Sequence, residues 1–143
     1  MGFTKTIEIR WRDLDGFGHV NNSTYLTYLE EARDEFLTGL LGATVHRVVV
    51  RRIEIDFRSG LVQDDDHVDV SVRLQRIGES SAATVERVVS VADGRLAAEA
   101  HTVVVHTDAS RTASAPWPDA ARRTLEEALA GTHAERTSAG GGA

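Results

Sequence analysis

Cysteine is absent from this sequence of 143 residues. Its absence excludes a disulfide framework, a thiolate nucleophile and a cysteine-based zinc site, and it fits a reducing cytoplasm. Long hydrophobic runs are also lacking, so no stretch can span a membrane, and residues 1–11 do not contain the apolar segment of a signal peptide. The formal net charge of −6 disfavours general binding to nucleic acid or to an anionic membrane. We therefore expect a cytoplasmic protein that has no membrane span and binds no nucleic acid.

The length of the chain sets the number of domains. A chain of 143 residues has the size of one domain and buries about two thirds of its unfolded surface, which is enough for a core without disulfides. The sequence contains no internal repeat and no linker. We expect a single domain over residues 1–131. Residues 132–143 are rich in Gly, Ser and Ala, and are predicted to form a disordered tail.

Alternation of apolar and polar residues predicts five β-strands. They cover residues 3–11, 45–57, 68–75, 83–92 and 96–107. Between the last two strands, Asp93-Gly94 is the strongest hairpin signal in the chain. Strands that are joined by tight turns pair antiparallel, so we expect an antiparallel sheet.

A long helix is predicted between the first two strands. Its apolar positions recur at intervals of three or four residues: Tyr25, Leu29, Ala32, Phe36 and Leu40. One of residues 21–23 is expected to cap its start, and Gly39 is expected at its end. On its polar side, Glu30 and Arg33 have the spacing of an i,i+3 ion pair. A second, short helix is predicted over residues 119–130, after Pro118.

The order of these elements indicates an α+β fold. A long helix with a wide apolar face needs a sheet that curls around it. A five-stranded antiparallel sheet wrapped around a long helix, with a short C-terminal helix, is the layout of a hot-dog fold.

The loop before the long helix contains the residues with catalytic potential. It brings two carboxylates to the start of the helix and reads Arg12-Asp13-Leu14-Asp15-Gly16-Phe17-Gly18-His19-Val20-Asn21-Asn22. A helix start offers unpaired N–H groups and a partial positive charge, which favour an electron-rich carbonyl or a developing oxyanion. A carboxylate beside such a donor can act as a base or as a nucleophile.

This loop resembles the motif of the 4-hydroxybenzoyl-CoA thioesterase family of hot-dog proteins, in particular its bacterial acyl-CoA thioesterase branch. The residues that continue the motif are Tyr25, Tyr28, Glu30, Glu31, Ala32 and Arg33. The resemblance implies hydrolysis of an acyl thioester, of CoA or of an acyl carrier protein, to a free acid and a thiol, with no cofactor or metal. It also implies a homodimer or homotetramer with active sites between subunits.

The resemblance also implies roles for individual residues. Asp15 is the catalytic carboxylate, and the backbone N–H of Asn22 polarises the thioester carbonyl. His19 is a candidate for supporting Asp15. Gly18 and Tyr25 are candidates for contact with the substrate.

Plainer roles remain possible for several of these residues. Asp15 has the residue type of a turn aspartate that caps its own loop, and His19 can equally hydrogen-bond the loop. Asp13 is expected to be structural, pairing with a neighbouring arginine or accepting loop N–H groups. Arg58, at a strand end beside a glycine turn, is the first candidate for CoA phosphate because a guanidinium suits phosphate oxygens, although most strand arginines are ordinary surface residues.

Two other functions stay open as alternatives. A non-catalytic module that binds acyl-CoA or acyl carrier protein would keep the pocket and would not need Asp15. A hydratase or dehydratase would use the same fold, but the His-Phe-Pro and Gly-Asp-x-Asn-Pro patterns of those enzymes are absent. For hydrolysis itself, the sequence leaves open whether Asp15 attacks the thioester or activates a water.

Overall fold

A computed structural model describes residues 2–140 of the chain, and the side chains of residues 2–132. Five strands form one sheet in the order β1-β3-β4-β5-β2, and every neighbouring pair is antiparallel. The strands are β1 (Gly2–Glu8), β2 (Val48–Phe57), β3 (His67–Ile77), β4 (Ser81–Ser90) and β5 (Leu96–His106). The five-stranded antiparallel sheet predicted from the sequence is confirmed.

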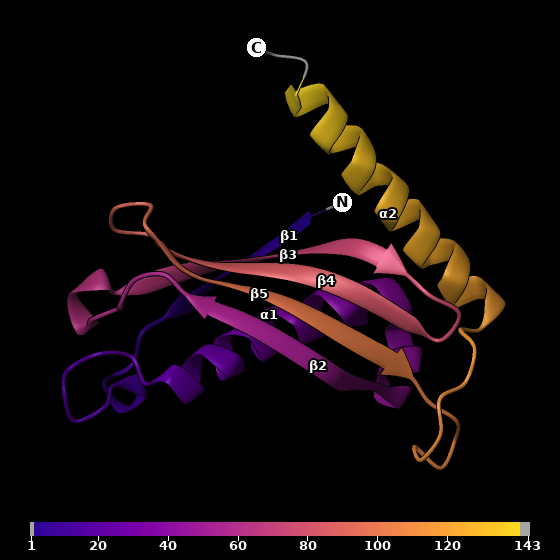
Figure 1. The fold of residues 1–143 in the computed structure, drawn as a ribbon, viewed down its shortest axis with the longest axis horizontal. Helices are drawn as coiled ribbons and strands as arrows, with labels where there is room; N and C mark the ends of the chain where they lie inside the picture. Colours follow the sequence, from indigo (N-terminus) through magenta and orange to yellow (C-terminus); the bar gives the residue numbers. More distant parts are fainter. Residues whose placement is uncertain (1, 141–143) are drawn as a thin grey trace.

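The long helix α1 (Asn22–Leu41) lies along one face of this sheet (Figure 1). Its buried residues form a stripe with helical spacing: Tyr25, Tyr28, Leu29, Ala32, Arg33, Phe36, Leu37 and Leu41. They pack against alternate, fully buried residues of β3, which are Val68, Val70, Val72 and Leu74. The apolar face does not extend around the whole helix, because Leu26 is 42% exposed. The hot-dog layout is nevertheless confirmed.

The ends of α1 differ in part from the prediction. Asn21 caps the start, and its side chain accepts a hydrogen bond from the N–H of Ser23 at 3.0 Å. The predicted end at Gly39 is wrong, because the helix continues to Leu41. Gly42, with φ of 55°, is the capping residue, and its N–H donates to the carbonyl of Thr38. A positive φ favours glycine, and the sequence offers two glycines within four residues.

β1 and β2 are each shorter than the sequence pattern predicted. β1 ends at Glu8, and the chain turns into a 3-10 helix, η1 (Trp11–Asp13), in which the Asp13 carboxylate accepts a hydrogen bond from the N–H of Arg10. Trp11 is therefore 83% exposed rather than part of a strand. β2 begins at Val48, because a second 3-10 helix, η2 (Gly42–Arg47), connects it to α1. A third, η3 (Gln63–Asp65), precedes β3.

The C-terminal helix α2 (Asp119–Gly140) is longer than the predicted residues 119–130 (Figure 1). It is anchored by Trp117, whose indole N–H donates to the carbonyl of Ser81 at 2.9 Å, and by Leu125, which is fully buried. Residues 132–140 of the expected disordered tail are thus helical, and residues 141–143 lie outside the described residues. The Gly and Ser content of this segment favoured disorder, but the helix formers between them, such as Ala134, Glu135 and Arg136, favour a helix.

Candidate active site

Asp13 links the loop to α1. It is 5% exposed, and its Oδ2 accepts hydrogen bonds from the N–H of Arg10 at 2.9 Å and from the hydroxyl of Tyr28 at 2.8 Å. The Arg10 Nε lies 3.5 Å from the same oxygen. Burial raises the pKa of Asp13, but the Arg10 N–H, the Tyr28 hydroxyl and the Arg10 charge together outweigh burial and keep this pKa below its usual value. The contacts expected for Asp13 are confirmed, because it pairs with Arg10 and accepts a hydrogen bond from a loop N–H.

Asp15 lies at the surface end of the loop and is only partly buried. Its Oδ1 accepts hydrogen bonds from the backbone N–H groups of Phe17 at 2.8 Å and His19 at 3.2 Å. Gly18, with φ of 84°, closes the turn, and its N–H donates to the Asp15 carbonyl at 3.2 Å. Within the described residues no group donates to Oδ2. One oxygen of Asp15 thus stabilises the turn, and the other is available for a ligand.

The start of α1 lies beside this turn. The N–H groups of Ser23 and Thr24 are satisfied by the side chain and the carbonyl of Asn21, at 3.0 and 2.8 Å. Asn22 is the first residue of the helix, where an N–H has no partner in its own helix. No other described residue accepts a hydrogen bond from it. The Asn22 N–H is therefore a donor at the positive end of the helix dipole.

A hollow of about 430 Å³ opens between the Asp15 turn, the start of α1 and the end of β2. Five residues predicted from the sequence line it together: Asp15, His19, Asn22, Tyr25 and Arg58. Gly18, a candidate for substrate contact, is not among its lining residues and lies in the turn instead. The structure therefore brings the carboxylate and the helix start to the same cavity.

The walls of the hollow combine apolar and basic groups. Tyr25 is 2% exposed and makes an edge-to-face contact with Phe57, with ring centroids 5.2 Å apart. Burial raises the pKa of Tyr25, so its hydroxyl keeps its proton at neutral pH. The Arg58 side chain is 58% exposed, with its Nη2 4.0 Å from an oxygen of Asp56. A guanidinium so placed can meet an anionic group at the mouth of the hollow.

Four lining residues were not predicted as site residues, and one of them, Val20, belongs to the loop that carries Asp15. Phe57, Ser59 and Gly60 lie close together at the end of β2 and just after it. The Ser59-Gly60 break after an alternating strand was visible in the sequence. Nothing in the sequence showed that this break would pack against the Asp15 loop, about 40 residues away.

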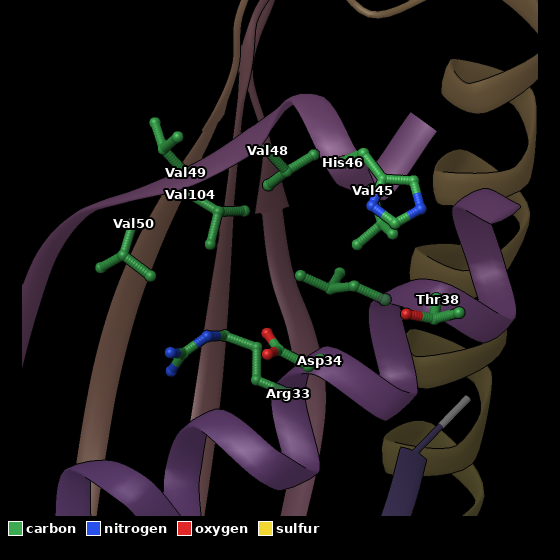
Figure 2. A pocket seen from close by; sticks show the side chains of 10 residues that line it. Arg33, Asp34, Thr38, Val45, His46, Val48, Val49, Val50 and Val104 are labelled. Atoms are coloured by element: carbon green, nitrogen blue, oxygen red, sulfur yellow. The ribbon is translucent and has the colours of Figure 1, made fainter. Parts of the chain in front are cut away.

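A second hollow, of about 280 Å³, lies between the other half of α1 and the start of β2 (Figure 2). Its apolar wall consists of Leu37, Val45, Val48, Val49, Val50 and Val104. Arg33 and Asp34 of α1 lie on one side of it, and His46 and Thr38 lie near its other end (Figure 2). None of the predicted site residues lines it.

Arg33 belongs to a buried ion pair. Its Nη1 lies 3.1 Å from Oε1 of Glu86, and the two side chains are 3% and 0% exposed. The hydroxyl of Thr84 donates to the same oxygen at 3.1 Å. Burial raises the pKa of Glu86, and the charge of Arg33 opposes this rise. The i,i+3 pair predicted between Glu30 and Arg33 is therefore wrong, because Arg33 points to the sheet.

Two further properties bear on the class of site. Among the side chains of residues 2–132, no group of three or more His, Cys, Asp or Glu is arranged to hold a metal ion. Among the helices the structure describes, none has the length and apolar character needed to cross a membrane.

Comparisons with known proteins agree with this arrangement. Residues 9–125 match the thioesterase-like superfamily. The long-chain acyl-CoA thioesterase FadM of Escherichia coli K12 is 31% identical over 99 residues, which cover 66% of this chain and 74% of FadM. A thioesterase from Thermus thermophilus, solved with coenzyme A and Zn, superimposes with a TM-score of 0.80 at 31% identity, over 90% of this chain and 94% of that one.

A predicted thioesterase from Bacillus stearothermophilus gives a TM-score of 0.81 at 28% identity, over 90% of this chain and 97% of the other. The matched residues include the Asp13–Asn22 loop and all of α1. The resemblance noted in the sequence is thus confirmed at the level of the family. The chain belongs to the thioesterase-like superfamily and is a thioester hydrolase with the hot-dog fold.

Proposed function

We propose that this protein hydrolyses acyl-CoA in the hollow beside Asp15, with Asp15 as the catalytic carboxylate. The observation that carries this proposal is that Asp15 and the N-terminal residue of α1, Asn22, line one cavity. Acyl transfer requires a group that attacks the carbonyl carbon or activates the attacking water. It also requires a hydrogen-bond donor to the carbonyl oxygen.

The reaction follows from these two groups. The Asn22 N–H donates a hydrogen bond to the thioester carbonyl and stabilises the negative charge that forms on its oxygen. Asp15 either attacks the carbonyl carbon, giving a mixed anhydride that water then cleaves, or removes a proton from an attacking water. In both routes the C–S bond breaks, the thiolate of CoA takes up a proton, and water supplies the new oxygen of the acid.

The choice of CoA rests on two relatives. FadM is a long-chain acyl-CoA thioesterase, and the Thermus thermophilus thioesterase was solved with coenzyme A. In this chain, Arg58 at the mouth of the hollow is the candidate contact for a CoA phosphate, and Tyr25 and Phe57 offer an apolar wall for the carbons next to the thioester. An acyl carrier protein thioester is the alternative donor. A cytoplasmic location, proposed from the lack of cysteine, fits either donor.

We further propose that the active unit is a homodimer or a homotetramer that pairs through β2. This strand lies at one edge of the described sheet, and three of its large apolar side chains are 42–47% exposed: Val49, Val50 and Phe57. An exposed apolar edge favours pairing with a second copy. In a two-fold antiparallel pair, the Val48 end of one β2 lies beside the Phe57 end of the other.

This pairing has a consequence for the acyl chain. The valine-lined hollow of Figure 2 in one subunit would lie next to the Asp15 hollow of its partner. An acyl chain whose thioester is bound at Asp15 could then extend between α1 and the sheet of the neighbouring subunit. The lengths of the acyl chains that the enzyme accepts would depend on this second hollow.

A thioesterase assay tests the function directly. Acetyl-, hexanoyl-, decanoyl-, palmitoyl- and benzoyl-CoA are offered in turn, and the released thiol is measured with a chromogenic disulfide. We expect turnover of at least one of these, and a sharp dependence on the acyl group. Binding of acyl-CoA by calorimetry with no thiol release from any of them, or from an acyl carrier protein thioester, would instead identify a non-catalytic binding module.

A further inference from the structure

Arg95, just before β5, holds the segment that forms one wall of the Asp15 hollow. Its Nε donates to the Ser59 hydroxyl at 3.1 Å, and its Nη2 donates to the Gly60 carbonyl at 3.1 Å. Ser59 and Gly60 line the hollow, whereas Arg95 does not. A single guanidinium thus fixes two consecutive residues of the wall from behind.

The guanidinium is itself fixed by a buried carboxylate. Its Nη2 lies 3.1 Å from both oxygens of Asp65, which is 7% exposed. Asp65 also accepts hydrogen bonds from the N–H of Val62 at 2.9 Å and from the Ser90 hydroxyl at 2.8 Å. These hydrogen bonds fix the position of the Asp65 carboxylate, and the carboxylate in turn fixes the position of the Arg95 guanidinium.

The wall in turn contacts the catalytic loop. A Cβ atom on Gly60 would lie 3.1 Å from Cδ2 of His19, so the wall and the imidazole already touch. The N–H of Val20 donates to the Leu61 carbonyl at 2.8 Å, which joins the two segments along the backbone. The N–H of His19 donates to Asp15. Contacts therefore run without interruption from Arg95 to the catalytic carboxylate.

We propose that Arg95 is a positioning residue, which holds Ser59 and Gly60 against His19 and so sets the width of the hollow where the thioester meets Asp15. This inference rests on the proposed function. The wall contacts the substrate in the ground state and in the transition state alike, so losing its position acts mainly on KM. A merely structural role would lower the melting temperature and leave the kinetics of the folded enzyme unchanged.

Three variants test this role. Arg95→Met keeps the length of the side chain and removes every hydrogen bond to the wall. Arg95→Lys keeps the charge opposite Asp65, but a single ammonium cannot reproduce the fork that reaches Ser59 and Gly60 together. Arg87→Met is the matched control, because Arg87 is an exposed arginine of the same sheet that pairs with Glu99 at 3.4 Å and touches neither the wall nor the loop.

Steady-state kinetics are measured with the fastest acyl-CoA of the panel, below the melting temperature of each variant. We expect Arg95→Met to lower kcat/KM by about tenfold to a hundredfold, with most of the loss in KM. Arg95→Lys should recover part of the loss, and Arg87→Met should match the wild type. Wild-type kcat and KM in folded Arg95→Met would overturn the proposal, as would an equal loss in Arg87→Met.

A milder change covers the case in which Arg95→Met does not fold. Ser59→Ala removes one acceptor of the charged guanidinium and should raise KM by about fivefold or more. An unchanged KM in this variant would also overturn the proposal. Turnover by the wild type tests the proposed function. The ratio of kcat/KM between each variant and the wild type tests the role of Arg95. If the wild type shows no turnover, the affinity of each variant for the decanoyl thioether of CoA is compared with that of the wild type. The same pattern of losses then supports or overturns the proposal.

Discussion

Asp15→Asn should remove most thioesterase activity and leave the fold unchanged. The folded turn depends on Asp15 Oδ1, which accepts hydrogen bonds from the N–H groups of Phe17 and His19. An asparagine has an oxygen in the same position and can accept both. The substitution therefore keeps the loop and the hollow, and it replaces the charged oxygen that is proposed to act on the substrate with a neutral NH2 group.

The size of the loss follows from the role of the charge. A positioned general base contributes about a hundred- to ten-thousand-fold to the rate. Loss of a nucleophile costs at least as much, because the amide cannot form the mixed anhydride. We therefore expect kcat to fall by at least about a hundredfold, and acyl-CoA binding to persist because the walls are untouched.

Asp13→Asn is the matched control, with the opposite pattern expected. Asp13 is buried, and its charged Oδ2 accepts from the Arg10 N–H and the Tyr28 hydroxyl. Loss of the charge weakens hydrogen bonds worth about 2 kcal/mol together, which corresponds to a drop of ~6 °C in melting temperature. The rate of the folded enzyme should change far less than in Asp15→Asn.

The assay combines thiol release with three checks: circular dichroism, melting temperature and oligomer size. Near wild-type turnover by Asp15→Asn would refute the mechanism. A loss of rate in folded Asp13→Asn alone would mean that Asp13 is the catalytic carboxylate.

The remaining predictions concern assembly and stability. Light scattering should give at least a dimer, and a monomer of 15.6 kDa would contradict pairing through β2. Glu86→Gln should cost about 3–5 kcal/mol of unfolding free energy, because it leaves the Arg33 charge buried without a partner, whereas Arg33→Met with Glu86→Leu should recover most of it in denaturant titrations. Because the pKa of Asp13 is lowered on folding, its stabilisation is complete above the unfolded value of 3.8 and is lost as pH falls through the folded pKa. The difference in melting temperature between wild type and Asp13→Asn should therefore shrink below pH 3.8. Deletion of residues 133–143 should leave melting temperature and activity unchanged, and a clear loss of either would show that this segment stabilises the domain.

The sequence predicted the sheet and the long helix because each depends on local periodicity. Alternating residues such as those of β3 can be buried on one face only in a strand, and the structure buries Val68, Val70, Val72 and Leu74 as expected. The ends of the elements were less accurate, since they depend on single contacts. The hydrogen bond from the Arg10 N–H to Asp13 ends the first extended segment early, and the positive φ at Gly42 decides which of two glycines stops α1.

The residues that form the wall of the candidate site could not be predicted from the sequence, for a different reason. Local spacing brings Asp15 and Asn22 to one helix start, so their proximity could be predicted. Ser59 and Gly60 reach the hollow only through the pairing of strands and through Arg95, which lies 35 residues after Gly60. The same holds for Arg33, whose partner Glu86 is 53 residues away on β4. Pairs of this kind depend on the register of the sheet, which no local pattern specifies.

The two aspartates of the loop have different surroundings in the folded protein, although the sequence alone gives them similar positions. Both precede the same helix start, and they differ by two positions. Asp13 points inward, where Tyr28 and Arg10 supply its donors, so its charge is already engaged by the protein. Asp15 points to the hollow and meets backbone donors through one oxygen only. A buried carboxylate that is paired with an arginine stabilises a fold, and a partly exposed one that lines a cavity can act on a substrate, so the assignment of Asp15 rests on the burial of Asp13 and on the cavity that Asp15 lines.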